Sequence, residues 1–181
     1  MPQDQTLDPQ SLPLLWLLSD ERNDEGLEQA VARLPSGSGF VYRHYHLAPE
    51  PRAERFAALL PALRDAGHWV IVSDTFETAE QWRADGVYGA PGDRAPAQLR
   101  WIATAHDEAE IAQANEYGAD AVMLSPVFPT RSHPGAATLG RERFRALARF
   151  AACPVIALGG MNAERAKELN WPRWAAIDGL S

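Results

Sequence analysis

Hydroxyl, guanidinium and imidazole groups are concentrated in one short polar segment of this 181-residue chain. The segment follows an apolar run over residues 121–124 and contains, in order, Thr130, Arg131, Ser132 and His133. About twenty residues further on, a second apolar run ends in Gly159 and Gly160 and leads into an expected helix. Glycines at a helix start let backbone N–H groups approach an anion closely. The two segments together predict an anion-binding site, with phosphate as the expected ligand.

Composition and charge restrict the class of protein. With 46% hydrophobic and 23% charged residues, the chain can fold as one globular domain. Its formal net charge of −7 argues against general nucleic-acid binding. No apolar run has the length of a membrane span. The lone Cys153 cannot form an internal disulfide, so we expect a reducing compartment, the cytoplasm.

The elements that position these residues are predicted from alternating apolar runs and helical patterns. The expected strands are Leu14–Ser19, Phe40–His46, Trp69–Ser73, Gly86–Tyr88, Leu99–Thr104, Ala121–Leu124, Pro154–Leu158 and Trp174–Ile177. The expected helices are Glu25–Leu34, Arg52–Ala66, Thr78–Ala84, Asp107–Tyr117, Arg141–Phe150 and Ala163–Asn170.

Eight strands with intervening helices predict an α/β fold, a short (β/α)8 TIM barrel in residues 13–181 that lacks its final helix. Residues 1–12 are expected to be a flexible N-terminal tail. We expect that tail, or a second subunit in a homodimer, to cover the flank that the absent helix leaves bare. In such a barrel the site lies at the C-terminal ends of the strands.

Several of these motifs resemble the thiamine phosphate synthase and TenI superfamily, in matching order from residue 14 onward. The matching segments are residues 15–20 in the first strand, 73–75 after the third, 104–106 after the fifth, 125–133 after the sixth and 157–161 after the seventh. The resemblance implies a barrel enzyme that joins hydroxymethylpyrimidine pyrophosphate to a thiazole phosphate. Small phosphorylated ligands are therefore the expected partners, with no nucleic acid and no membrane.

The resemblance also implies roles for particular residues. Mg²⁺ would be held by Asp74 and Asp93, although the turn before Asp93 differs from the family pattern. The residues assigned to catalysis are Asp74, Thr104, His106 and His133. Those assigned to phosphate or substrate binding are Arg43, His44, Thr130, Arg131, Ser132, Gly159 and Gly160.

Departures from the family pattern suggest a weakened site. His133 stands where the family has a lysine, and the chain contains a single lysine, Lys167, so the site is expected to be poor in permanent positive charge. Strand alternation places His44 on the opposite face from Arg43, and a slip of one residue would exchange them. Asp178 stands where a phosphate-facing serine is usual, and a carboxylate there repels phosphate.

Two classes of function remain open on the sequence. One is a thiamine phosphate synthase of weak or altered activity; the other is a non-catalytic or regulatory ligand-binding barrel. A thiazole tautomerase is less favoured, because Pro126 replaces the histidine that the related tautomerases have. His44 and His46 could suggest a zinc site, but without a nearby carboxylate or cysteine such a pair is more typical of barrel lining.

Overall fold

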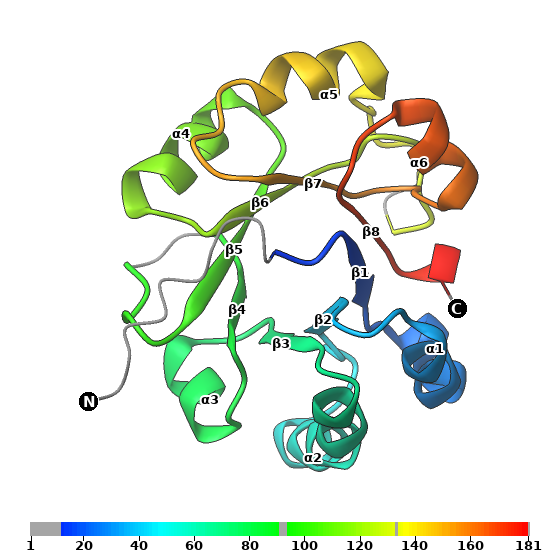
Figure 1. Ribbon diagram of the computed structural model, residues 1–181, viewed down its shortest axis with the longest axis vertical. Helices are drawn as coiled ribbons and strands as arrows, with labels where there is room; N and C mark the ends of the chain where they lie inside the picture. Colours follow the sequence, from blue (N-terminus) through cyan, green and yellow to red (C-terminus); the bar gives the residue numbers. More distant parts are fainter. Residues whose placement is uncertain (1–11, 91–93, 133, 181) are drawn as a thin grey trace.

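Eight parallel strands pair in chain order and close into a barrel, with β1 next to β8 and the helices around the outside (Figure 1). The computed structural model describes residues 12–90, 94–132 and 134–180. The strands are β1 Leu15–Leu18, β2 Gly39–Tyr42, β3 Trp69–Val72, β4 Gly86–Gly89, β5 Arg100–Ala105, β6 Ala121–Leu124, β7 Val155–Ala157 and β8 Trp174–Ala176. The expected (β/α)8 barrel is confirmed.

The α-helices are α1 Leu27–Arg33, α2 Pro49–Asp65, α3 Phe76–Gln81, α4 Glu108–Tyr117, α5 Gly140–Ala148 and α6 Ala163–Leu169. Two 3-10 helices, η2 Glu21–Gly26 and η3 Asp178–Leu180, follow β1 and β8. The first expected helix is therefore divided into η2 and α1. Sequence signals at helix ends hold elsewhere: Asp107 accepts the N–H of Glu110 at 2.9 Å, and Gly118 ends α4 with φ of 75°.

Apolar residues on both faces of the strands build two cores. One fills the barrel interior and includes Trp16, Val41, Ile71, Ile102, Met123 and Ile156. The other lies between the strands and the helices and includes Phe40, Tyr42, Val70, Phe56 and Leu59. Parallel strands covered by helices need apolar residues on both faces, which explains why the runs in the sequence are continuous.

The indole ring of Trp16 fills one end of the barrel interior. A Cβ on Gly39 would lie within the ring of Trp16, so glycine is required where β2 passes this side chain. Trp16 also meets Trp69 edge to face, with 6.2 Å between ring centroids. This packing closes one end of the barrel interior and leaves the C-terminal ends of the strands for the site.

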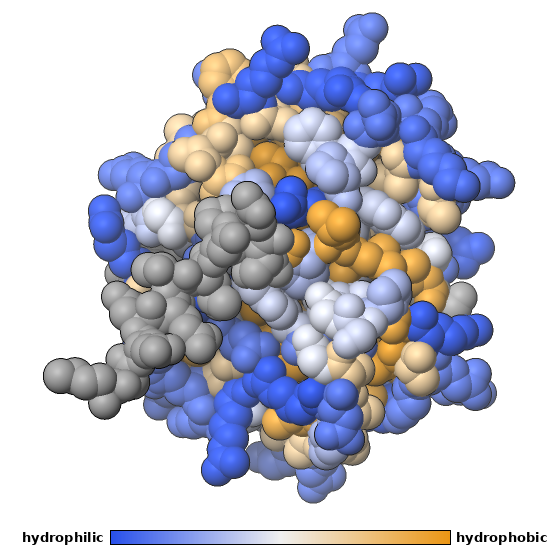
Figure 2. All heavy atoms as spheres, viewed as in Figure 1, coloured by the Kyte–Doolittle hydropathy of each residue, from blue (hydrophilic) through white to orange (hydrophobic). Residues whose placement is uncertain are grey.

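The chain has no full helix after β8 within the described residues, and η3 is the last element there. The expected tail lies outside them except for Leu12, which is 5% exposed and packs in the barrel interior. Figure 2 shows apolar side chains gathered over β1 and β8, surrounded by hydrophilic ones. Among the described residues, no helix has the length and apolar character needed to cross a bilayer.

Candidate functional site

A cavity of about 640 Å³ opens at the C-terminal ends of the strands. Most of the predicted site residues line it: Arg43, Thr104, His106, Thr130, Arg131, Ser132, Gly159 and Gly160. His44 and Asp74 are not among its lining residues. His133 and Asp93 lie outside the described residues. Eight of the predicted site residues therefore lie together around one cavity, where they supply about half of its described polar side chains.

Permanent positive charge surrounds this cavity. Arg22, Arg43, Arg131 and Arg165 all line it, from the segments that follow β1, β2, β6 and β7. The expectation of a site poor in permanent cations is therefore wrong. Arginine keeps its charge at every physiological pH and presents a planar set of donors that matches phosphate oxygens.

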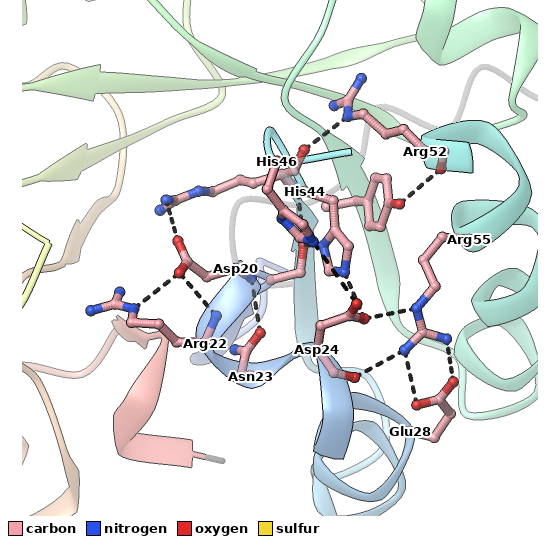
Figure 3. Close-up of polar contacts among 12 residues, drawn as sticks. Asp20, Arg22, Asn23, Asp24, Glu28, His44, His46, Arg52 and Arg55 are labelled. Atoms are coloured by element: carbon pink, nitrogen blue, oxygen red, sulfur yellow. Dashed lines mark hydrogen bonds and ion pairs between the residues drawn. The ribbon is translucent and has the colours of Figure 1, made fainter. Parts of the chain in front are cut away.

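Arg22 and Arg43 share one carboxylate. Arg22 Nε donates to Oδ1 of Asp20 at 3.0 Å (Figure 3). Arg43 Nη2 donates to Oδ2 of the same carboxylate at 2.9 Å. Burial raises the pKa of the Asp20 carboxyl, but hydrogen bonds from Arg22 outweigh burial and, with the charge of Arg43, hold the pKa below its usual value. The carboxylate is thus ionised at neutral pH and fixes both guanidinium groups.

Arg22 also links three of the segments that line the cavity. Its Nη2 donates to Ser132 Oγ at 3.0 Å, and its Nη1 lies 3.3 Å from Oδ2 of Asp178. The expected repulsion between Asp178 and a phosphate is therefore reduced, because an arginine neutralises this carboxylate. The contact joins the segments after β1, β6 and β8.

One donor of Arg43 has no partner. Its Nε is buried and makes no hydrogen bond among the described residues, while the side chain is only 17% exposed. An unpartnered donor on a charged group is costly to bury. A ligand oxygen entering the cavity would satisfy it.

Backbone hydrogen bonds connect the Gly159-Gly160 turn to the loop after β6. Val127 and Phe128 donate their N–H groups to the carbonyls of Leu158 at 2.9 Å and Gly159 at 3.0 Å. Gly159 has φ of 96°, and a Cβ there would lie 2.6 Å from Cα of Pro126. Gly160 has φ of 62°, and its carbonyl accepts a hydrogen bond from Arg165. Both glycines are required by backbone conformation and close approach.

His106 and Thr104 come from the end of β5. The His106 ring is exposed, and its Nδ1 lies 2.8 Å from Oε2 of Glu110, one turn into α4. Thr104 and His106 both line the cavity, and Glu110 holds the imidazole of His106 through its Nδ1. A histidine oriented in this way can exchange a proton with a bound ligand.

The second strand ends earlier than the sequence predicted, and this changes the expected position of His44. β2 ends at Tyr42 instead of His46, because His44 has φ of 41°. Val41 faces the interior and Tyr42 the helices, so Arg43 follows on the cavity side without any slip. The His44 ring is fully buried and stacks on Tyr42 at 4.7 Å, and this burial lowers its pKa. The assignment of His44 to substrate binding is therefore not supported by its position.

Asp74 lies in the connection between β3 and α3, and both of its carboxylate oxygens have partners there. Its Oδ2 is paired with Arg52 Nη1, and its Oδ1 accepts from the N–H of Thr75 and the hydroxyl of Thr78, each at 2.8 Å. Burial raises the pKa of this carboxyl, but these contacts outweigh it and the net shift is downward. In the structure Asp74 organises the start of α3.

Sequence reasoning missed Arg22 and Arg165. Both could have been found by position, because each follows closely on the C-terminal end of a strand, where barrel sites are built. Arg165 lies in the first turn of α6, five residues after Gly160, and its guanidinium stacks 5.2 Å from the centroid of Phe128.

Comparisons with known proteins match most of the chain. The family model for thiamine monophosphate synthase matches residues 15–177. A thiamine-phosphate synthase of Chloroflexus aurantiacus is 31% identical over 148 residues, covering 77% of this chain and 67% of the relative. One of Limosilactobacillus reuteri is 30% identical over 166 residues, covering 82% and 76%.

Among solved structures, a thiamine phosphate pyrophosphorylase of Pyrococcus furiosus superposes with a TM-score of 0.75. It is 24% identical and covers 93% of this chain and 87% of that one. At this identity the likeness supports the fold alone.

Proposed function

Because the chain belongs to the thiamine monophosphate synthase family, we propose that its cavity binds hydroxymethylpyrimidine pyrophosphate and a thiazole phosphate and joins them into thiamine phosphate. The observation that carries the proposal is the convergence of four arginines and the Gly159-Gly160 turn on one cavity. Two phosphorylated substrates bring several negative charges into one small volume, and such a lining can balance them.

The chemistry proposed for the cavity is a substitution at the pyrimidine methylene carbon. The bond to pyrophosphate breaks with both electrons leaving on oxygen, and the thiazole nitrogen then donates its electron pair to the resulting carbocation. Negative charge grows on the leaving pyrophosphate in the transition state, so fixed cations lower the barrier. We assign this role to Arg43 and Arg22, whose guanidinium groups are held by Asp20.

The thiazole phosphate is assigned to the part of the cavity that the Gly159-Gly160 turn and Arg165 line. Arg165 is held by the Gly160 carbonyl and by the ring of Phe128, so it needs little reordering when a phosphate binds.

The described residues do not by themselves fit the Mg²⁺ site that the family resemblance implies. Asp74 has both carboxylate oxygens engaged, one of them by Arg52, and does not line the cavity. Asp93, its expected partner, lies outside the described residues. We therefore derive no step through Mg²⁺.

A non-catalytic ligand-binding barrel is the second candidate, and Asp178 favours it. This carboxylate lines the cavity and pairs with Arg22, so it takes up part of the positive charge that a leaving group would need. Tautomerase activity is not proposed, since Pro126 lines the cavity where the related enzymes have a histidine.

Isothermal titration with each substrate, with and without Mg²⁺, tests the proposed function. The proposal expects saturable, one-to-one binding of both ligands and competition of inorganic pyrophosphate with the pyrimidine substrate. Binding of the thiazole phosphate alone would favour the binding-barrel alternative. Binding of neither ligand would overturn both.

A further inference from the structure

Three potential metal ligands converge outside the cavity, beside the C-terminal end of β2. They are Asp24 from η2 and His44 and His46 from the turn after β2 (Figure 3). One ligand atom from each lies within 4.8 Å of the others. The sequence shows no carboxylate next to the two histidines, but the fold brings Asp24, twenty residues before His44, beside them.

The two oxygens of Asp24 face different imidazoles. Nε2 of His44 lies 2.8 Å from Oδ1, and Nε2 of His46 lies 3.9 Å from Oδ2. The two rings are tilted by 42° with centroids 5.0 Å apart, so both imidazoles lie beside the same carboxylate. Two imidazole nitrogens and one carboxylate oxygen form a ligand set used for zinc and related transition metals.

His44 is held in the orientation that ligation requires. Its Nδ1 lies 2.8 Å from Ser19 Oγ, which also accepts the N–H of Arg43 at 2.8 Å. When a metal ion displaces the proton of Nε2, Nδ1–H can donate to this hydroxyl and the lone pair of Nε2 is directed at the site. A hydrogen bond at the second ring nitrogen is the usual support of a metal-bound histidine. Stacking on Tyr42 fixes the plane of the same ring.

Charge at the cluster also suits a divalent cation. Arg55 donates to Oδ1 of Asp24 at 2.8 Å, but its other nitrogens bind the Asp24 carbonyl and Glu28. The carboxylates of Asp24 and Glu28 together with the guanidinium of Arg55 therefore carry a net negative charge. Oδ2 of Asp24 faces His46 and is not contacted by Arg55 among the described residues.

We propose that Asp24, His44 and His46 bind one divalent transition-metal ion of the zinc type, at a site separate from the substrate cavity. His44 supplies a buried ligand, whereas Asp24 and His46 are partly exposed. Three protein ligands leave a coordination position open to water on the exposed side. The ion would take the place of the proton shared by His44 and Asp24.

Zinc alone is the probe, added to the untagged, metal-free full chain. We expect isothermal titration and equilibrium dialysis to show one ion per chain, and Zn²⁺ to raise the melting temperature. His46→Gln should weaken binding by at least about tenfold, because a ligand is lost. His46 lies in a turn and is partly exposed, so this variant should keep its fold, which circular dichroism checks.

His106→Gln is the matched control, since His106 is an exposed histidine that also faces a carboxylate. Its zinc affinity should equal that of the wild type. Co²⁺ uptake with a visible spectrum that His46→Gln abolishes would support the site. No saturable uptake of Zn²⁺, or uptake that His46→Gln leaves unchanged, would overturn the proposal.

Discussion

Replacing Arg43 by glutamine should reveal how much of catalysis depends on fixed charge in the cavity. The side chain is 17% exposed, so solvent screens it little, and its Nη2 is held at 2.9 Å by Asp20. The change leaves an amide donor at about the position of Nε but removes the charge and both terminal nitrogens, including the Nη2 that donates to Asp20. Asp20 would retain Arg22 as its partner, so the loop should stay in place.

The expected loss follows from the role assigned to this group. Removing one positioned donor from a transition state costs about 2 to 4 kcal/mol, which corresponds to about 30-fold to 1000-fold in kcat. Arg43→Lys, which keeps the charge but not the planar donors, should fall between wild type and Arg43→Gln. The assay is the initial rate of pyrophosphate release at saturating concentrations of both substrates.

Arg64→Gln provides the control for this experiment. Arg64 is paired with Asp85 at 2.7 Å, where β4 begins, away from the C-terminal ends of the strands. Its replacement should leave kcat within about twofold, because surface ion pairs contribute little. If Arg43→Gln retained kcat within threefold of wild type, the assignment of Arg43 to the leaving group would be refuted.

Three further outcomes are expected. Gly160→Val should abolish binding of thiazole phosphate in titration, because φ of 62° disfavours a β-branched residue and its Cβ would meet the carbonyl of Pro129. Arg165→Gln should raise the Kd for thiazole phosphate by about tenfold or more, as expected for a lost charge-assisted hydrogen bond; an unchanged Kd would place the phosphate elsewhere. The lowered pKa of Asp20 means that its contribution to stability is present above the unfolded value, near about pH 4, and is lost as pH falls through the folded value. Urea unfolding should therefore show a smaller acid-side loss of stability in Asp20→Asn than in wild type, and equal losses would contradict the ion-pair account.

Local signals predicted the fold and much of the cavity. Continuous apolar runs identify parallel strands that are buried on both faces, and Asp107 with Gly118 marks both ends of α4. Gly159 and Gly160 were recognisable because their conformations are ones that other residues rarely adopt. Such signals depend on a residue and its immediate neighbours, which a sequence displays directly.

Contacts between distant segments could not be predicted in this way. The second strand was extended to His46 because alternation gave no sign of the positive φ at His44. Arg22 gains its role from Asp178 and Ser132, each more than a hundred residues away in the chain. Asp24 likewise meets His46 only after η2 packs beside the turn that follows β2.

The most direct test of the proposed synthase is a turnover measurement on the purified full chain. Both substrates are supplied across a series of Mg²⁺ concentrations, and thiamine phosphate and pyrophosphate are quantified together. We predict that the two products form in equal amounts and over many turnovers per chain, and that Arg43→Gln slows both equally. Tight binding of both substrates with no thiamine phosphate at any Mg²⁺ concentration would contradict the account and identify a ligand-binding barrel instead.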